Sequence, residues 1–350
     1  MDKIKSFEDF IRNEKGKRDY LVFVSHDTLK INKYMNAFSK ESDNLYFLLN
    51  FNNLMFSNCY NPLLFEDGYD NGIYKLCNFI CNRYFGKISP EELLLRSIVL
   101  YLLYHRPVEE RNFLSVLKLL HAGESFRLNP KNGSPLDDIF DEIYKKNCNS
   151  HDIEDYCAFK SYPVETQKKA FANLINLLNV LEADENKNFL IYNEMLHIYD
   201  HSDATFVCLP QSQDKTFISF LPYIYLYQCL DYLNSSDAYN WCSFNSTFNI
   251  KICFDETVDI NIIKDIEKNI FTFREKVSFV NISKIPIENE DNTNLICTFD
   301  NYKKYNNVST SQEARKILEE NVNKIPESYE LNDVLKKIQK NNKRKKKNKR

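Results

Sequence analysis

The stretch that most constrains the fold is Asn249–Ile260, which reads NIKICFDETVDI. Apolar side chains alternate with more polar ones from residue 249 to residue 254, and this period of two predicts a buried or half-buried β-strand. The strand ends in an acidic pair, Asp255 and Glu256. In α/β proteins the carboxyl ends of strands present side chains to ligands. The plainer interpretation, which this fragment favours on its own, is that the pair begins a solvated turn.

The rest of the chain alternates short β-type runs with helical segments. Further strands are predicted at Tyr20–Val24, Leu45–Asn50, Thr205–Leu209, Ser278–Ile282 and Leu295–Phe299. Helical periodicity lies between or after them, at Lys30–Asp43, Ile73–Phe85, Thr216–Leu233, Ile262–Arg274, Ser311–Asn323 and Leu331–Gln339. Because strands that alternate with helices form mostly parallel sheets, we expect an α/β fold.

A different pattern begins at Ser89, where Ser-Pro-Glu-Glu combines a capping residue, an early proline and two acids of a helix start. Similar starts follow at Pro107 and Ser134, and Glu165–Leu181 is a further helix. We therefore expect an all-α domain at 89–198. It would interrupt an α/β domain made of residues 1–88 and 199–310, with C-terminal helices and a disordered basic tail at 311–350.

The composition argues against several kinds of site. Only 6 of the 350 residues are glycine, which disfavours a Gly-rich phosphate loop. None of the 10 cysteines has the CxxC spacing of a zinc or redox site, and Cys77 and Cys81 are expected to be small core residues. The histidines form no HExxH motif, and a polar helix end is favoured over a metal site at His197 and His201. No metal ligand is therefore predicted.

The chain ends in a cationic tail, Asn341–Arg350. Its basic residues are Lys343, Arg344, Lys345, Lys346, Lys347, Lys349 and Arg350. Subtracting these 7 positive charges from the net charge of −3 leaves −10 on the rest of the chain. Such a tail binds nucleic acid, an acidic protein or an anionic membrane surface, or it only increases solubility. The tail residues are candidates for nucleic-acid binding.

The sequence predicts no membrane span. Residues 1–20 lack the apolar run of a signal peptide. The longest apolar runs, Leu93–Tyr104 and Phe217–Leu230, are both interrupted by polar residues or proline, and a span needs roughly 18 uninterrupted residues. We expect a cytoplasmic protein, with peripheral attachment to the inner face of the cell membrane as an alternative.

The order of these segments resembles the cytoplasmic part of type IV secretion coupling proteins. These are the TraG/TraD-like DNA-transfer ATPases of conjugative elements, and the forms from Gram-positive mobile elements are the most similar. The resemblance extends over residues 18–310 and is carried by Tyr20–Lys30, Tyr60-Asn61-Pro62-Leu63, Glu91–Glu124, Ser134–Phe140, Thr205–Phe220 and Ile250–Arg274. It implies a RecA-like, mostly parallel sheet that is interrupted by an inserted all-α domain.

The sequence also departs from this family. The GxxxxGK[ST] phosphate loop and the membrane helices are not found, and the chain begins just downstream of where the loop would be expected. The family's Asp-Pro-Lys-Gly-Glu turn corresponds to Ser25-His26-Asp27-Thr28, and its glutamine after the Val-Ser strand corresponds to Ile282. The resemblance therefore implies a divergent, truncated relative.

Three residues remain at catalytic-type positions of the family. Asp255 would hold magnesium, Glu256 would position the attacking water, and Arg274 would act on a neighbouring subunit's phosphate. Without the phosphate loop these residues are expected to be vestigial, so the resemblance implies no ATPase activity and no cofactor. The alternative is an active DNA-translocating ATPase that receives ATP and Mg²⁺ with a phosphate loop supplied by another chain.

The expected partners follow from the same resemblance. They are a full-length coupling ATPase, a relaxase–DNA complex or a protein of the secretion channel, in a homo- or hetero-oligomer such as a mixed ring. A third hypothesis is a non-specific DNA-binding protein that acts through the basic tail. This tail is also the expected contact with an anionic membrane surface.

Overall fold

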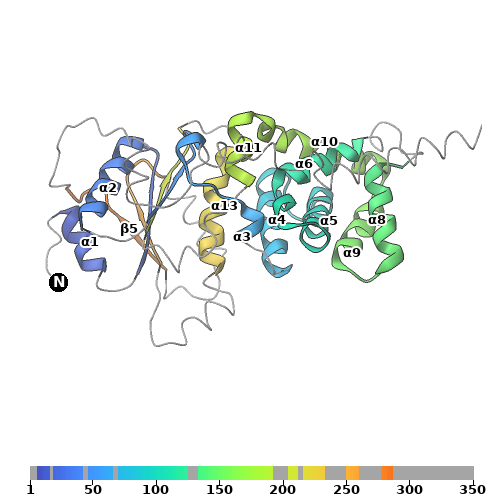
Figure 1. The fold of residues 1–350 in the computed structure, drawn as a ribbon, viewed down its shortest axis with the longest axis horizontal. Coiled ribbons are helices and arrows are strands. Elements are labelled where there is room, and N and C mark those ends of the chain that lie inside the picture. Colours follow the sequence, from blue (N-terminus) through green and yellow to red (C-terminus); the bar gives the residue numbers. More distant parts are fainter. Residues whose placement is uncertain are drawn as a thin grey trace, which may run out of the picture. The chain divides into compact units, whose positions relative to one another are not determined.

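The computed structural model describes residues 6–15, 19–41, 46–65, 70–124, 133–191, 204–211, 216–232, 250–259 and 277–286 (Figure 1). The chain divides into two compact units. The first contains residues 1–60 and 194–313, and the second contains residues 61–193 and 314–350. All of the described strands belong to the first unit. The borders expected for a helical insertion, at residues 89 and 198, remain a prediction.

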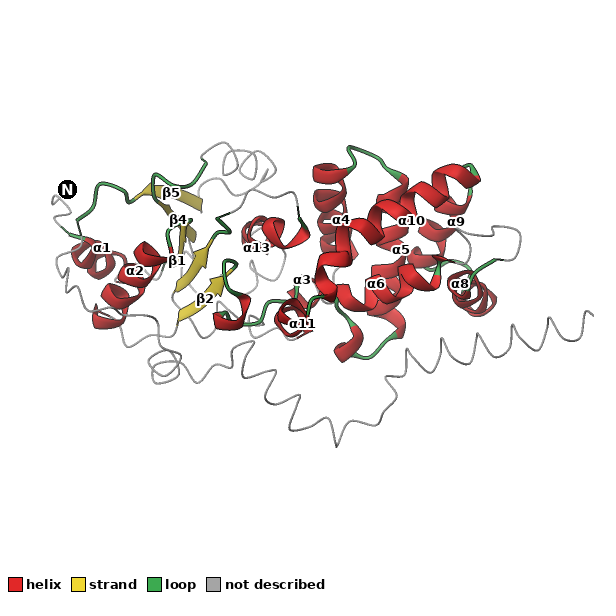
Figure 2. Ribbon diagram, turned by 90° about the horizontal axis from the view of Figure 1, so that it is seen from above, coloured by secondary structure: helices red, strands yellow, loops and turns green. Residues whose placement is uncertain are grey.

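The first unit is built on a sheet of five parallel strands in the order β2-β3-β1-β4-β5 (Figure 2). The strands are β1 (Tyr20–Ser25), β2 (Tyr46–Asn50), β3 (Ala204–Cys208), β4 (Ile250–Phe254) and β5 (Val277–Asn281). Parallel strands are usually covered on both faces, which explains their nearly continuous apolar sequences. The predicted α/β fold with a mostly parallel sheet is confirmed.

Two helices, α1 (Phe7–Lys15) and α2 (Thr28–Glu41), cover one face of this sheet, and α13 (Phe217–Tyr232) lies on the other side (Figures 1 and 2). The α13 helix is apolar around its whole circumference, and its described side chains are buried or half-buried. A helix without a polar face is expected to be enclosed on all sides.

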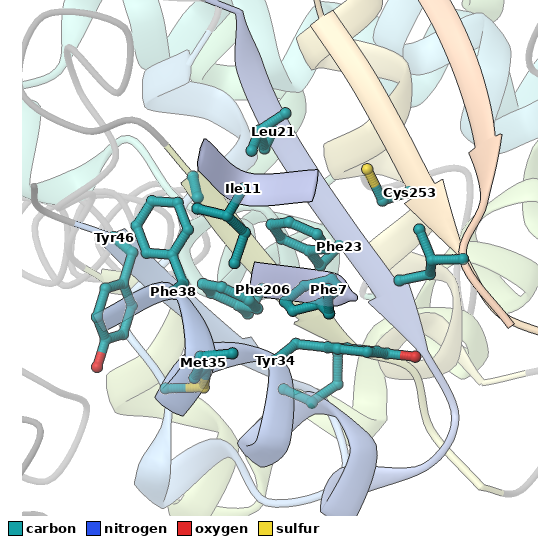
Figure 3. Close-up of a cluster of buried hydrophobic side chains, with 14 of the residues drawn as sticks. Phe7, Ile11, Leu21, Phe23, Tyr34, Met35, Phe38, Tyr46, Phe206 and Cys253 are labelled. Atoms are coloured by element: carbon teal, nitrogen blue, oxygen red, sulfur yellow. The ribbon is translucent and has the colours of Figure 1, made fainter. Parts of the chain in front are cut away.

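The core beneath α1 and α2 is aromatic (Figure 3). Phe7 of α1 lies against Tyr34 of α2, with ring centres 4.6 Å apart. Phe23 of β1 stacks on Phe206 of β3, with ring centres 4.8 Å apart. All four side chains are buried, and each aromatic pair adds about 0.5–1.5 kcal/mol to the effect of its buried area. Phe7 also packs edge-on against Phe23, with ring centres 5.5 Å apart, and this contact joins α1 to the sheet.

The α1 helix was not predicted from the sequence. Phe7, Phe10 and Ile11 are three and four residues apart and form one buried apolar face. At the other end of the helix, Glu14 forms an ion pair with Lys251 of β4. A 9-residue helix this rich in charge is marginal in isolation, so its contacts with the sheet determine that it forms.

The described elements of the second unit are all helical. They are α3 (Pro62–Phe65), α4 (Asp70–Tyr84), α5 (Pro90–His105), η2 (Val108–Glu110), α6 (Phe113–Ala122), α8 (Pro135–Lys146), α9 (His151–Lys160), α10 (Val164–Leu178), η4 (Asn179–Glu182) and α11 (Asp184–Ile191). The central helix is α5, which packs against α4, α6, α9 and α10. Its side chains are buried on most sides, which explains its long apolar run.

The helix starts of this unit follow the capping rules. Ser89 caps α5 through its side chain, and Ser134 forms a reciprocal capping box with Asp137 at the start of α8. The helix predicted to start at Pro107 is in fact divided, because η2 is a single turn and α6 begins only after Asn112. Asn112 has extended backbone angles and caps α6 with its side chain.

Other sequence predictions differ from the structure or lie outside it. The α9 helix was not predicted, because its polar and apolar residues show no clear period. The helices predicted at Ile262–Arg274, Ser311–Asn323 and Leu331–Gln339 and the strand at Leu295–Phe299 lie outside the described residues. Among the helices that the structure describes, none combines the length and the apolar character needed to cross a bilayer.

Candidate functional site at the carboxyl ends of β1 and β4

The strand order creates a switch point between β1 and β4. The chain leaves β1 toward β2 on one side of the sheet, and it leaves β4 toward β5 on the other side. In open parallel sheets, ligands bind outside the carboxyl ends of the strands at such a point. Ser25 ends β1 here, and Asp255 and Glu256 follow the end of β4. The acidic pair therefore lies where the topology places a ligand site.

Asp255 is buried, with 1% of its surface exposed. Its Oδ2 atom accepts a hydrogen bond of 2.6 Å from Ser25 Oγ. Its Oδ1 atom accepts one of 2.9 Å from the backbone N–H of Thr257 and another from the Thr257 hydroxyl. Asp255 thus joins β4 to β1 and shapes the turn after β4, whereas the Glu256 side chain is 58% exposed in that turn.

The amino terminus of α2 is occupied by a side chain of the same protein. Only His26 and Asp27 connect β1 to α2. Asp27 Oδ1 accepts hydrogen bonds of 2.9 Å from Leu29 N–H and 3.3 Å from Lys30 N–H. A phosphate bound at a helix amino terminus would use the same kind of N–H groups. The Asp27 carboxylate therefore caps α2 and engages N–H groups of the kind that a phosphate would use.

Lys30 provides the positive charge at this edge of the sheet. Its Nζ atom forms an ion pair with Glu256 and lies 4.0 Å from Asp255 Oδ2. The hydrogen bond between Lys30 and Glu256 raises the pKa of the lysine and lowers the pKa of the glutamate. Because Glu256 is exposed, water screens this pair and it adds little to stability. Lys30 also stands close to Asp255, where a bound metal ion would need to lie.

The loop after β3 is bound to the same edge. His26 Nδ1 donates a hydrogen bond of 2.8 Å to the carbonyl oxygen of Pro210. The backbone N–H of Gln211 donates one of 2.7 Å to Asn52 Oδ1, and the Asn52 amide lies 3.1 Å from Cys208 Sγ. Burial raises the pKa of the Cys208 thiol, which disfavours the reactive thiolate. Cys208 is therefore a structural residue here.

The polar groups at this edge satisfy one another. Both oxygens of Asp255 accept hydrogen bonds, Asp27 caps α2, and Lys30 offsets part of the acidic charge. A metal ion or a phosphate would compete with these contacts. Within the described ranges, no group of three or more His, Cys, Asp or Glu side chains is arranged to hold a metal ion.

The structure thus places two of the sequence candidates together and leaves the others outside its description. Asp255 and Glu256 are adjacent at the switch point, whereas Arg274 and the basic residues of the tail lie outside the described residues. Sequence reasoning missed the contributions of Ser25, Lys30 and Thr257. The strand-then-turn pattern after β1 was the available signal for Ser25, but nothing local indicated that β1 and β4 would be neighbours.

The Tyr-Asn-Pro run, on which part of the resemblance rests, makes structural contacts. Tyr60 is buried and donates a hydrogen bond from its hydroxyl to Gln228 Oε1. Asn61 Oδ1 caps α3 by accepting a hydrogen bond of 3.1 Å from Leu63 N–H, and its Nδ2 donates one of 2.8 Å to the carbonyl oxygen of Arg111. These contacts stabilise the fold, and this structural role is enough to explain why Tyr60 and Asn61 occur here.

Comparison with protein-family models and with curated proteins finds no match to this chain.

Proposed function

We propose that this chain is a partner-binding component of a type IV secretion or conjugative DNA-transfer system that does not turn over a nucleotide itself. The transfer context rests on the resemblance in segment order to the coupling proteins. The side-chain contacts at the carboxyl edge of the sheet support the lack of nucleotide turnover. The sheet unit would act as a rigid platform, and the partner would supply the chemistry.

The observation that carries the proposal is the Asp27 carboxylate at the amino terminus of α2. Asp27 engages the N–H groups of Leu29 and Lys30, and only two residues separate β1 from α2. A phosphate group that bound at this helix amino terminus would have to displace the Asp27 carboxylate. A phosphate and a carboxylate are both negative, and like charges repel strongly where water is excluded. The arrangement therefore favours a site that stays closed to nucleotides.

The same contacts disfavour an ATPase completed by a phosphate loop from another chain. Asp255 would have to exchange its bonds with Ser25 and Thr257 for a magnesium ion, and Lys30 would have to move away. Losing the bond from Ser25 would also remove the side-chain link between the ends of β1 and β4. We therefore favour a full-length coupling ATPase or a relaxase–DNA complex as the partner, in a homo- or hetero-oligomer.

Nucleotide binding provides the first test. The full chain is titrated with a fluorescent ATP analogue, with and without Mg²⁺, beside the variants Asp255→Asn and Leu29→Asn. We expect no saturable binding to any of the three proteins. Micromolar, Mg²⁺-dependent binding that Asp255→Asn abolishes and Leu29→Asn retains would contradict the proposal and support an ATPase. Leu29 is a suitable control because it lies beside the site and its side chain is exposed.

Partner binding provides the second test. The full chain and a form without residues 341–350 are each mixed with the coupling ATPase and the relaxase encoded by the same genome, and complexes are measured by analytical size exclusion. We expect a complex with one of them that does not require ATP. If neither protein binds, and the full chain instead binds random-sequence DNA in a manner lost with the tail and with salt, the non-specific DNA-binding hypothesis is favoured.

A further inference from the structure

The turn between α4 and α5 carries an exposed aliphatic side chain on an unfavourable backbone. Ile88 has φ of +56°, the only non-glycine residue with positive φ in the described part of the chain. Its side chain is also 86% exposed, more than any other large apolar residue described. A β-branched residue in the left-handed region is a genuine outlier. Folding alone would favour glycine or asparagine at this position.

The surrounding residues make this turn cationic and aromatic. Arg83 and Lys87 are exposed, and Tyr84 and Phe85 are half-buried. The segment from residue 83 to residue 90 contains no acidic residue. The turn therefore combines two cations, two aromatic rings and a projecting aliphatic side chain.

The acids that follow this turn in the sequence are buried. Glu91 and Glu92, in the first turn of α5, are 6% and 8% exposed. Glu91 accepts a hydrogen bond of 2.7 Å from Asn173 of α10, and Glu92 pairs with Arg96 at 3.4 Å. Because Glu91 is bonded to α10 and Glu92 to Arg96 within α5, neither carboxylate neutralises the charge of Lys87 in the turn.

We propose that residues 83–88 form a contact with an anionic lipid bilayer. Arg83 and Lys87 would meet the phosphate head groups, and Ile88 would enter the boundary with the acyl chains. Tyr84 and Phe85 would lie at the level of the head groups, where aromatic side chains are enriched. Strained backbone conformations are retained where they serve a function. Here the strained turn would project the Ile88 side chain into the lipid.

A nucleic acid fits this turn less well. Single strands are held mainly by bases that stack on exposed aromatic faces, whereas the most exposed side chain here is aliphatic and both rings are half-buried. A contact of this size is weak alone, and stable membrane attachment needs two signals. The cationic tail at Asn341–Arg350 would provide the second one. This inference does not depend on the proposed function.

Vesicle co-sedimentation tests the contact with the full chain. The vesicles contain phosphatidylcholine, with or without phosphatidylglycerol, and the variants are Ile88→Asn, Ile88→Leu and the matched control Leu29→Asn. Leu29 is another exposed aliphatic residue, at 71%. We expect binding to the anionic vesicles only, weakened about tenfold or more by Ile88→Asn and unchanged by the other two variants. Because asparagine tolerates positive φ, Ile88→Asn should melt at the same or a higher temperature, which excludes unfolding as the cause.

Several results would overturn the contact. They are equal binding of the wild type and Ile88→Asn, equal weakening by Leu29→Asn, or no binding to any vesicle. A form without residues 341–350 separates the two signals, because residual binding that still depends on Ile88 identifies the turn. If single-stranded DNA binds and Ile88→Asn weakens it while the vesicles remain unbound, the turn is a nucleic-acid contact and the lipid proposal fails.

Discussion

Ser25 and Asp255 are 230 residues apart in the sequence, yet Ser25 Oγ donates a hydrogen bond of 2.6 Å to Asp255 Oδ2. The bond joins the ends of two neighbouring strands, β1 and β4, and Asp255 is buried. An acidic residue at the carboxyl end of a central strand thus serves as a structural acceptor.

Replacing Asp255 by alanine should destabilise the protein. The change leaves the buried Ser25 hydroxyl without its acceptor and removes the bond from the Thr257 N–H, so the free energy of unfolding should fall by about 1–3 kcal/mol. The matched change Glu256→Ala removes an exposed carboxylate and should leave stability nearly unchanged. Urea denaturation measures both. Equal effects of the two changes would show that Asp255 has no special structural role.

Arg96 should be among the most sensitive residues of the second unit. It forms two hydrogen bonds with Asp155, pairs with Glu92 and lies 4.4 Å from the ring centre of Tyr74. Arg96→Met should cost about 3–5 kcal/mol, because it leaves two nearly buried carboxylates without their cation. Arg96→Lys should recover only part of this lost stability, because lysine lacks the planar guanidinium group that binds a carboxylate through two hydrogen bonds.

The control for Arg96 is Lys168→Met, which breaks an exposed pair with Glu165. That change should shift the free energy of unfolding by about 0.5 kcal/mol or less. Chemical denaturation of the three variants gives the comparison. A loss from Arg96→Met no larger than that of the control would contradict a structural role for the buried pair.

The contact between His105 and Asp152 should make stability depend on pH. Burial opposes ionisation of Asp152, but hydrogen bonds from His105 and Ser150 outweigh it and lower the pKa of the aspartate. A lowered pKa in the folded state stabilises the protein above about pH 4, the pKa of an unfolded aspartate. The contribution disappears as the pH falls through the lower pKa of the folded protein. Asp152→Asn should therefore flatten the acid side of the stability curve.

Unfolding measured from neutral to acid pH tests this expectation. The control is Glu165→Gln. The Glu165 side chain is 82% exposed, so this change should leave the loss of stability at acid pH unaltered. If the wild type and Asp152→Asn lose stability in parallel below about pH 4, Asp152 does not carry the effect.

Gly123 should not tolerate a side chain. A Cβ atom there would lie 2.2 Å from the Phe171 ring, so α6 ends in close contact with α10. Gly123→Ala should cost about 1–3 kcal/mol through overpacking. Phe171→Leu in the same protein should restore part of the loss, and a double-mutant cycle of thermal unfolding measures this coupling. Additive effects would argue against direct contact.

Much of the fold was predictable from local patterns. The five strands in the described residues match their predictions within one residue at each end, because buried parallel strands are short apolar runs with clear borders. The starts of α5 and α8 were readable from Ser89 and Ser134, whose side chains satisfy backbone N–H groups. In contrast, α1 and α9 were missed, because contacts with other elements stabilise these short polar helices.

The candidate site was predictable only in part. The position of Asp255 and Glu256 at a strand end followed from the alternation before them. The roles of Ser25 and Lys30 did not, because they depend on β4 lying next to β1 in the sheet. The cap by Asp27 was also missed, because the helix was predicted to begin at Lys30 and it begins at Thr28.

Local sequence determined where the strands and most helices lie, because apolar periodicity and capping chemistry act over a few residues. Tertiary structure decided the strand order, and with it which polar side chains meet at the carboxyl edge of the sheet. The physical reason is that a buried carboxylate such as Asp255 takes its role from the hydrogen-bond donors that surround it. Those donors come from segments that only the folded chain brings together.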